Sequence, residues 1–478
     1  MGSGVSRVLD LQSLRARFNA LDQGHVFRFW DLLGEVEQEA LLSQLKRIDL
    51  QALTTALEAT RARETSAPPT LSPTPVERMP LAGGNSSRWQ AAREHGERLL
   101  SEGRVAVVVV AGGQATRLGF PGPKGLFPIG PITERSLFEL QAQKLRRLAA
   151  RYGRPLPWYV MTSPSTDAPI RAFFKQRDGF GLAEADIFCF EQAMLPSFDF
   201  EGRLMLATPG SLSENPDGHG GCLTALLASG ALDDMEARGV TTLFYYQVDN
   251  PLIRMADPAY LGFHAEASAE MSCKVVRKAE PSEKMGTVAR IGDSLGIVEY
   301  TELDDAQRFA TDENGQLVYW AGSPAIHIFQ TAFIRRIALE ADRWLPYHAS
   351  VKKIPTLDDA GRPVTPEEPN GHKLERFVFD ALPAAERTAV VETARAVEYS
   401  PVKNAHGSDS PQTARRDLVA SYRTWLEESG IPVPPDVRIE FDQSRIDGPD
   451  DVRALGIRDL SDAADWMHIE PENSGAPT

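Results

Sequence analysis

The 478-residue sequence predicts an α/β fold, and three observations support this prediction. A run of mostly valine residues, Val105–Val110, is typical of a strand that is buried on both faces of a parallel sheet. A glycine-rich loop follows this run directly, and ligands collect at the carboxyl ends of such strands. Further apolar runs alternate with amphipathic, helix-like segments, as expected of an α/β protein.

The N-terminal segment, residues 9–65, is expected to be helical. Apolar residues recur there at intervals of three and four among charged residues, which produces the stripe of an amphipathic helix; examples are Leu11, Leu14, Phe18, Leu41 and Leu45. Residues 66–87 hold five prolines and no apolar period, so a loop is expected there. We place the helical N-terminal region at residues 1–95.

Strands and helices are predicted in turn along the next two hundred residues. The patterns predict strands over Trp158–Met161, Ile187–Phe190, Leu243–Val248 and Cys273–Val276, and helices over Ser136–Arg151 and Leu223–Arg238. Between residues 286 and 330 the strands become closely spaced, and the turn pairs Gly292-Asp293 and Asn314-Gly315 predict hairpins. A hairpin-rich insertion at about 280–330 is therefore expected, placed to cover a site.

Composition and charge lower the expectation of several functions. The chain has 51 Lys and Arg against 66 Asp and Glu, a net charge of −15, which repels nucleic-acid backbones and anionic membranes. Its three cysteines, Cys189, Cys222 and Cys273, lack the spacing of a disulfide framework or zinc site. No apolar run is long enough for a membrane span, and no targeting segment is expected. We therefore expect a cytoplasmic protein without nucleic-acid or membrane partners.

The strongest motif lies directly after the valine strand. It reads Ala-Gly-Gly-Gln-Ala-Thr-Arg-Leu-Gly over 111–119, and Pro123-Lys124-Gly125 follows. Glycines let backbone N–H groups approach a phosphate, while Arg117 and Lys124 supply positive charge. The motif is neither a Walker A loop nor G-x-G-x-x-G, which disfavours kinases, GTPases and Rossmann dehydrogenases. A glycine-rich turn with surface cations is the alternative.

Several ordered motifs together resemble the eukaryotic-type UDP-sugar pyrophosphorylase family. Besides the glycine-rich loop, they are segments 215–221, 246–250, 274–278, 298–300, 369–380 and 399–404. Residues 26–53 resemble the N-terminal region of the UDP-N-acetylhexosamine pyrophosphorylase branch. The resemblance implies a Rossmann-like central mixed sheet, of the nucleotide-diphospho-sugar transferase or GT-A-like kind. It implies a catalytic domain at 96–420 and leaves 421–478 as a small C-terminal appendage.

The resemblance implies a reversible reaction of UTP with a sugar 1-phosphate that yields a UDP-sugar and pyrophosphate. By motif position, Arg117 and Lys124 would hold the triphosphate, and Lys403 would bind the sugar phosphate. Asp249 would bind Mg²⁺ or Mn²⁺, because a hard cation needs few protein oxygens when phosphates supply the others. A solvated surface lysine remains the alternative for Lys403, and a turn-capping residue that for Asp249.

The residues expected to bind the nucleotide by resemblance are Gly112, Gly113, Gln192, Gly218 and His219. His219 departs from the asparagine usual in this branch, although an imidazole can still donate a hydrogen bond. A surface amide is the alternative interpretation of Gln192.

The resemblance assigns the sugar to Gly286, Glu299, Ile326, Phe377 and Phe379. Ile326 stands where the branch has an asparagine, and losing a polar contact can shift selectivity between sugars. The two phenylalanines fit a core strand or helix equally well.

The sequence predicts a uridylyltransferase that makes UDP-N-acetylglucosamine from UTP and N-acetylglucosamine 1-phosphate. The helical N-terminal match favours this product, whereas Ile326 favours UDP-glucose or UDP-galactose. A catalytically silent nucleotide-sugar sensor is the alternative of another class. Retention of Arg117, Lys124, Asp249 and Lys403 argues against a sensor, because a sensor needs no stabilisation of a leaving group.

Overall fold

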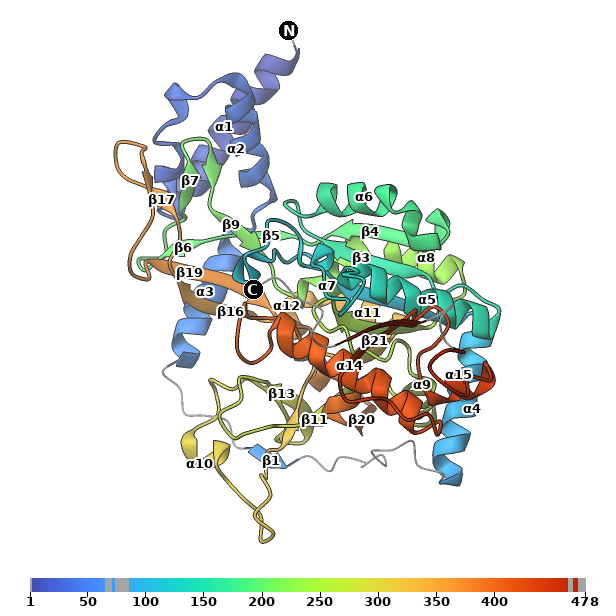
Figure 1. Cartoon of the computed structure of the whole chain (residues 1–478). Helices are drawn as coiled ribbons and strands as arrows, with labels where there is room; N and C mark the ends of the chain where they lie inside the picture. The colour runs from blue at the N-terminus through green and yellow to red at the C-terminus, as the bar shows by residue number, and fades with distance from the viewer. Residues whose placement is uncertain (1, 65–70, 74–85, 463–466, 472–478) are drawn as a thin grey trace. The chain divides into compact units, whose positions relative to one another are not determined.

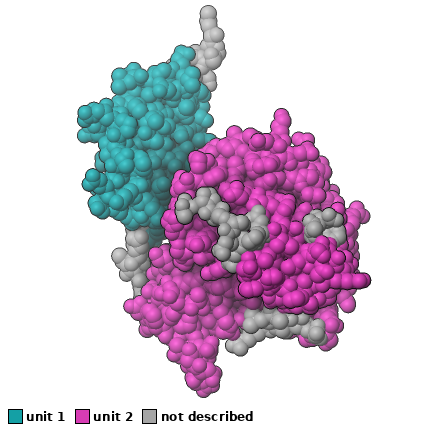
Figure 2. All heavy atoms as spheres, viewed as in Figure 1, with its two compact units in different colours: residues 1–67, 192–224, 340–380 teal, residues 68–191, 225–339, 381–478 magenta. Residues whose placement is uncertain are grey.

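A computed structural model describes residues 2–64, 71–73, 86–462 and 467–471. The chain divides into two compact units, shown in different colours in Figure 2. Unit 1 combines residues 1–67, 192–224 and 340–380, and unit 2 combines 68–191, 225–339 and 381–478. The units therefore interleave along the sequence and differ from the three consecutive segments 1–95, 96–420 and 421–478.

Unit 2 is built around a mixed sheet, which confirms the predicted fold class (Figure 1). Its parallel part has the order β10 (Thr242–Gln247), β2 (Val105–Val110), β3 (Trp158–Thr162) and β4 (Ile187–Glu191). On the other side of β10, the antiparallel β15 (His327–Gln330) connects to β11 (Met271–Arg277), which pairs in parallel with β20 (Thr388–Glu392). All five predicted strands are present, and nearly all of β2 is buried, as its valines predict.

The helices of unit 2 begin and end where local chemistry dictates. Helix α5 (Leu137–Tyr152) starts with a capping box between Ser136 and Glu139 and ends at Gly153, which has φ of +67°. The expected continuous helix Leu223–Arg238 is wrong. The segment forms α7 (Gly221–Ala228) and α8 (Ala231–Ala237), separated at Gly230, whose φ of +79° no right-handed helix accommodates.

The insertion contains the expected hairpin. Strands β12 (Thr287–Ile291) and β13 (Ser294–Val298) pair across a turn with Gly292 at φ of +61°. Strand β14 (Ala321–Gly322) pairs with β12 and β11. The described residues of the proline-rich segment include β1 (Leu71–Pro73), which pairs with β12 where a loop was expected. The rest of that prediction lies largely outside the described residues.

The C-terminal segment shares the core of unit 2. It includes α14 (Pro411–Glu427), β21 (Val437–Phe441), α15 (Pro449–Ala454) and β22 (Met467–Pro471). Tyr422, Leu426, Ile439 and Phe441 belong to the same buried cluster as the valines of β2. Side chains of this segment therefore pack in the core of unit 2, while β21 and β22 pair with each other.

Unit 1 has its own core and contains the predicted N-terminal helices. These are α1 (Gly2–Ala20), α2 (Glu35–Arg47) and α3 (Leu50–Glu64). A small antiparallel sheet orders β16 (Tyr347–Lys352), β19 (Gly371–Arg376) and β6 (Phe198–Asp199). Leucines of α2 and α3 are buried in one cluster with residues of this sheet. The N-terminal stripe therefore reflects real core packing.

The remaining helices and strands are as follows. The helices are α4 (Ser87–Ser101), α6 (Asp167–Gln176), α9 (Pro258–Glu266), α10 (Asp305–Arg308), α11 (Thr331–Leu339), α12 (Ala341–Trp344) and α13 (Arg395–Glu398). The strands are β5 (Met194–Pro196) with β9 (Glu214–Pro216), β7 (Leu206–Thr208) with β8 (Ser211–Leu212), and β17 (Thr356–Leu357) with β18 (Pro363–Val364). Among the described residues, no helix combines the length and apolar character that crossing a membrane requires.

Replacing Glu440 tests whether the C-terminal segment stabilises unit 2. The buried Glu440 carboxylate accepts hydrogen bonds from the N–H groups of Ile132 and Thr133, both at 2.7 Å, and from the Thr133 hydroxyl. Glu440→Ala removes these three hydrogen bonds to a charged group, each of which contributes about 1.5–3 kcal/mol. We expect thermal unfolding to show a melting temperature lowered by about 5 °C. Glu313→Ala, at an exposed carboxylate, is the control; equal melting of both variants would contradict this role.

Candidate functional site

The glycine-rich loop folds back on the Pro-Lys segment that follows it. The N–H of Lys124 donates to the carbonyl of Gly113 at 3.0 Å, and the N–H of Ala115 donates to Gly122 at 2.9 Å. Gly113 is exposed, and a Cβ added there would meet no atom within 4 Å. The loop therefore offers open backbone beside Lys124, as phosphate binding requires. Arg117 lies on the same loop and is exposed.

Lys124 and Asp249 form an ion pair at the carboxyl edge of the sheet. Lys124 Nζ lies 3.3 Å from Asp249 Oδ2, and their side chains are 20% and 11% exposed. The pair forms because β2 and β10 are parallel neighbours, and the loops after their carboxyl ends meet at one edge. The structure therefore places the predicted metal ligand against the predicted triphosphate-binding lysine.

Lys403 belongs to the same group of residues. The preceding residue, Val402, donates its N–H to the carbonyl of Asp249 at 2.9 Å. Lys403 Nζ donates to the Tyr399 hydroxyl at 3.1 Å and lies 3.9 Å from Asp409. Burial alone lowers the pKa of Lys403, but Tyr399, Asp249 and Asp409 together raise it above its usual value. Lys403 therefore has the carboxylates of Asp249 and Asp409 as neighbours, while its side chain stays 36% exposed.

The protein supplies too few oxygen ligands at this edge to surround a divalent cation by itself. Among the described residues, no three His, Cys, Asp or Glu side chains converge as a metal cage would require. Asp249 supplies one carboxylate, and Mg²⁺ commonly takes one or two protein carboxylates and completes its shell with phosphate and water. The donor set therefore fits a cation that arrives with a nucleotide.

Three predicted binding residues that lie in unit 1, namely His219, Phe377 and Phe379, have their rings packed together. His219 stacks on Phe377 with centroids 5.3 Å apart, and Phe379 lies 5.6 Å from His219. His348 stacks on the Phe377 ring at 4.4 Å, and its Nε2 is 2.8 Å from Asp380 Oδ2. We call His219, His348, Phe377 and Phe379 the ring cluster. No motif in the sequence pointed to His348, which lies on β16.

His219 is held neutral and in one orientation. Its Nδ1 accepts the N–H of Val378 at 3.1 Å, which leaves Nε2 to carry the proton and act as a donor. Burial, and then the neighbouring His348, lower the pKa of His219 to about 4. At neutral pH this imidazole can therefore donate a single hydrogen bond, from Nε2.

The other predicted nucleotide residues of unit 1 lie on separate segments. Gly218 has φ of +84°, and a Cβ there would lie 2.5 Å from the carbonyl of Arg376, so only glycine fits. Gln192 is buried just before β5 and is not part of the ring cluster. Sequence reasoning also missed Asp217, a buried carboxyl whose Oδ1 has no hydrogen-bond partner among the described residues.

The predicted sugar residues of unit 2 are partly brought together. Gly286 and Glu299 are neighbours, since a Cβ on Gly286 would lie 3.4 Å from Glu299 Oε1. Ile326, by contrast, is 1% exposed and packs in the main core, while its carbonyl accepts the N–H of Lys274. The Ile326 side chain therefore stabilises the sheet.

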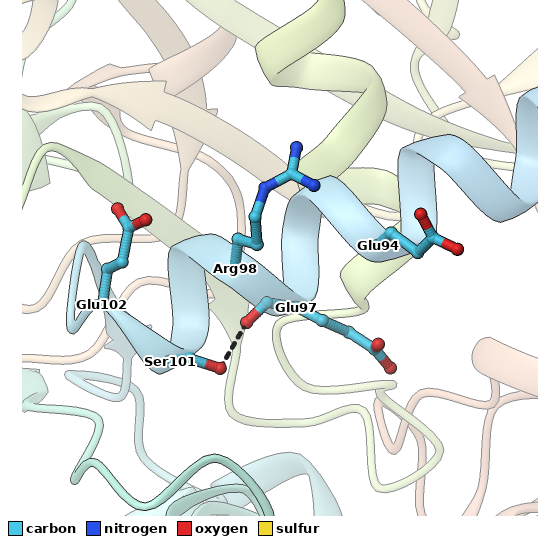
Figure 3. A pocket seen from close by; sticks show the side chains of 5 residues that line it. All are labelled: Glu94, Glu97, Arg98, Ser101 and Glu102. Atoms are coloured by element: carbon cyan, nitrogen blue, oxygen red, sulfur yellow. Dashed lines mark hydrogen bonds between the residues drawn. The ribbon is translucent and has the colours of Figure 1, made fainter.

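One surface pocket lies apart from all of these residues. It runs along helix α4 and is lined by Glu94, Glu97, Arg98, Ser101 and Glu102 (Figure 3). None of the predicted site residues lines it. Glu97 already pairs with Arg93 and Arg151, so the charges here belong to a network of surface ion pairs.

Comparisons with known proteins agree with the motifs. The family model described as UTP–glucose-1-phosphate uridylyltransferase matches residues 71–413. UDP-N-acetylhexosamine pyrophosphorylase-like protein 1 of Xenopus tropicalis is 37% identical, over 88% of this chain and 87% of the relative. UDP-N-acetylglucosamine pyrophosphorylase of Saccharomyces cerevisiae is 35% identical, over 87% of this chain and 91% of the relative.

Solved structures show the same relationship. The crystal structure of the uridine diphosphate N-acetylglucosamine pyrophosphorylase from Trypanosoma brucei, in complex with an inhibitor, has a TM-score of 0.78. Its sequence is 26% identical, and the match covers 88% of this chain and 86% of that one. A UDP-glucose pyrophosphorylase of Leishmania major, at 16% identity and a TM-score of 0.58, shows the shared fold alone. The resemblance predicted from the motifs is confirmed.

The buried carboxyl of Asp217 predicts a pH dependence of stability. Burial raises the pKa of Asp217 to about 7, although Arg376 opposes the shift. The folded chain therefore keeps a proton that the unfolded chain releases near pH 4, and stability falls as pH rises from about 4 to about 7. Asp217→Asn cannot ionise. At each pH the melting temperature of Asp217→Asn is compared with that of the unsubstituted chain. We expect this difference to shift in favour of the variant by roughly 5 °C from pH 5 to pH 8.

Glu201→Gln provides the control because it changes an exposed carboxylate of the same unit. Its melting temperature should keep a constant offset across this pH range. A constant offset for Asp217→Asn as well would show that Asp217 ionises normally.

Proposed function

Because the chain belongs to the UTP–glucose-1-phosphate uridylyltransferase family, we propose that it makes UDP-N-acetylglucosamine and pyrophosphate from UTP and N-acetylglucosamine 1-phosphate. The observation that carries the proposal is the convergence of Lys124, Asp249 and Lys403 at one edge of the sheet. The similarity to named N-acetylglucosamine pyrophosphorylases over most of the chain supports the choice of sugar.

The proposed reaction is an in-line displacement at phosphorus. An oxygen of the sugar phosphate attacks the α-phosphorus of UTP and forms a new P–O bond. The bond from the α-phosphorus to the bridging oxygen breaks, and pyrophosphate leaves with the electron pair. Because two anions must approach and the leaving group gains charge, catalysis here is positioning and electrostatic stabilisation.

Lys124 and Lys403 supply positive charge on the two sides of this displacement. The Lys124 ammonium is held in place by Asp249, and the Lys124 backbone N–H binds the carbonyl of Gly113 on the open loop. We assign Lys124, with Arg117, to the triphosphate and the departing pyrophosphate. We assign Lys403 to the sugar phosphate, and its raised pKa keeps it charged across the physiological range.

Asp249 is proposed to hold Mg²⁺ or Mn²⁺ together with the phosphates. When bound, the cation would neutralise charge on the phosphoryl oxygens. Without a nucleotide, Asp249 instead balances the charge of Lys124. The nucleotide-binding roles of Gly112, Gln192, Gly218 and His219 stay predictions, as does the cytoplasmic location.

The sugar-binding roles of Phe377 and Phe379 stay predictions. Within unit 1 their rings pack with that of His219, whose Nε2 is left as a donor. Ile326 had favoured glucose or galactose, but its side chain is buried in the core and offers a sugar no contact. That argument for the alternative product therefore loses its force. A silent sensor is disfavoured because it would not need the pair of lysines beside Asp249.

A panel of sugar 1-phosphates tests the proposed substrate. Pyrophosphate release is measured with UTP, Mg²⁺ and the 1-phosphates of N-acetylglucosamine, glucose and galactose. We expect the highest kcat/KM for N-acetylglucosamine 1-phosphate. A preference for glucose 1-phosphate would reverse the choice of sugar, and no release with any of them would favour the sensor.

Lys124→Ala tests the assignment of the triphosphate lysine. Removal of a principal charge stabiliser is expected to lower turnover at least about 100-fold. The control is Lys175→Ala, which removes an exposed lysine on α6 of the same unit and should leave turnover unchanged. Near-normal turnover of Lys124→Ala would refute the assignment.

A further inference from the structure

We infer that Asn250 is a positioning residue that sets Lys403 against Asp249, an inference that rests on the proposed function. Asn250 follows the proposed metal ligand directly in the chain, and its side chain is buried at 3% exposure. It therefore touches the protein interior, and any influence on the reaction acts through its neighbours.

The Asn250 amide binds the backbone of the segment that leads to Lys403. Its Nδ2 donates to the carbonyl of Glu398 at 2.7 Å, and its Oδ1 accepts the N–H of Ser400 at 3.1 Å. Only a side-chain amide provides both a donor and an acceptor in one plane at this length. The two hydrogen bonds hold the peptide groups on both sides of Tyr399.

A third hydrogen bond, next to Asn250, also holds the segment that leads to Lys403. The carbonyl of Asp249 accepts the N–H of Val402 at 2.9 Å. Residues 249 and 250 thus fix residues 398–402 at three points, and Lys403 is the next residue. Its side chain turns back so that Nζ meets the hydroxyl of Tyr399, whose peptide groups Asn250 holds.

The segment that Asn250 holds is anchored from the other side as well. The Glu398 carboxylate is fully buried and accepts hydrogen bonds from Lys274 Nζ, 2.7 Å from both oxygens, and from the Thr393 hydroxyl at 2.9 Å. Lys274 also binds Asp257 at 2.9 Å. Glu398 is therefore fixed to β11, so Asn250 connects two rigid parts rather than a rigid part to a loose loop.

This arrangement links the two ends of the proposed chemistry. Asp249 would bind the cation, and Lys403 would bind the attacking phosphate. Asn250 sets the backbone geometry between these two residues. Loss of the amide is expected to let Lys403 move while the lysine itself is retained. Misplacement of a positioned group by about 1 Å can cost on the order of 100-fold in rate.

A double-mutant cycle tests this inference. Pyrophosphate release with UTP, Mg²⁺ and N-acetylglucosamine 1-phosphate is measured for the unsubstituted chain, Asn250→Ala, Lys403→Ala and the double variant. We expect Asn250→Ala to lower kcat/KM for the sugar phosphate by roughly 10- to 100-fold. In the Lys403→Ala background the same change should cost less than about twofold, because its effect is already lost. An equal loss in both backgrounds would overturn the inference.

Two further variants separate positioning from folding. Gln23→Ala is the matched control, because Gln23 is also a buried amide that holds a backbone segment through two hydrogen bonds, to the carbonyl of Gly202 and the N–H of Leu204. It should leave kcat/KM unchanged. If Asn250→Ala does not fold, Asn250→Asp keeps the acceptor for Ser400 and loses the donor to Glu398, and the cycle is run with that variant and the same expectation of non-additivity.

Different results would refute the proposed function and the role of Asn250. An unsubstituted chain that releases no pyrophosphate from any sugar 1-phosphate would refute the proposed function itself. An active chain in which Asn250→Ala and Lys403→Ala act independently would refute only the role of Asn250.

Discussion

The ion pair between Lys124 and Asp249 is the interaction on which the candidate site depends. It exists because β2 and β10 are paired in parallel, with Val110 opposite Gln247, so the residues after both strands share one edge of the sheet. The same register brings the glycine-rich loop beside Asp249. The backbone of Asp249 in turn holds the segment that leads to Lys403. One strand pairing thus gathers the charges needed to bring two anions together.

The sequence predicted the central fold well because its signals there were local. Val105–Val110 became a buried strand, and Ser136 with Glu139 marked the start of α5. One error arose where a tertiary contact decided the outcome, and another where a local break in a helix was overlooked. Strand β1 is three residues long in a proline-rich segment and forms only by pairing with β12. The break at Gly230 interrupts a helical pattern that continues on both sides of it.

The site was predictable where short motifs carry the chemistry, and unpredictable where contacts join distant segments. The motifs pointed to Lys124, Asp249 and Lys403, which the fold gathers at one edge. Asn250 lay in a recognised motif, but its hydrogen bond to Glu398 spans 148 positions of the chain, and no local pattern encodes that contact. The same reason hid His348, whose partner Phe377 lies on another segment. The burial of Ile326 was hidden too, because a single apolar residue has the same appearance in a core and in a pocket.

Calorimetric titration with UTP tests most directly whether these charges bind a nucleotide. The full chain and its Asp249→Asn variant are titrated with and without Mg²⁺. We expect the unsubstituted chain to bind UTP more tightly when Mg²⁺ is present, and Asp249→Asn to lose that dependence because the carboxylate would share the cation with the phosphates. If the unsubstituted chain takes up no UTP under either condition, the convergence of Lys124, Asp249 and Lys403 does not form a nucleotide site.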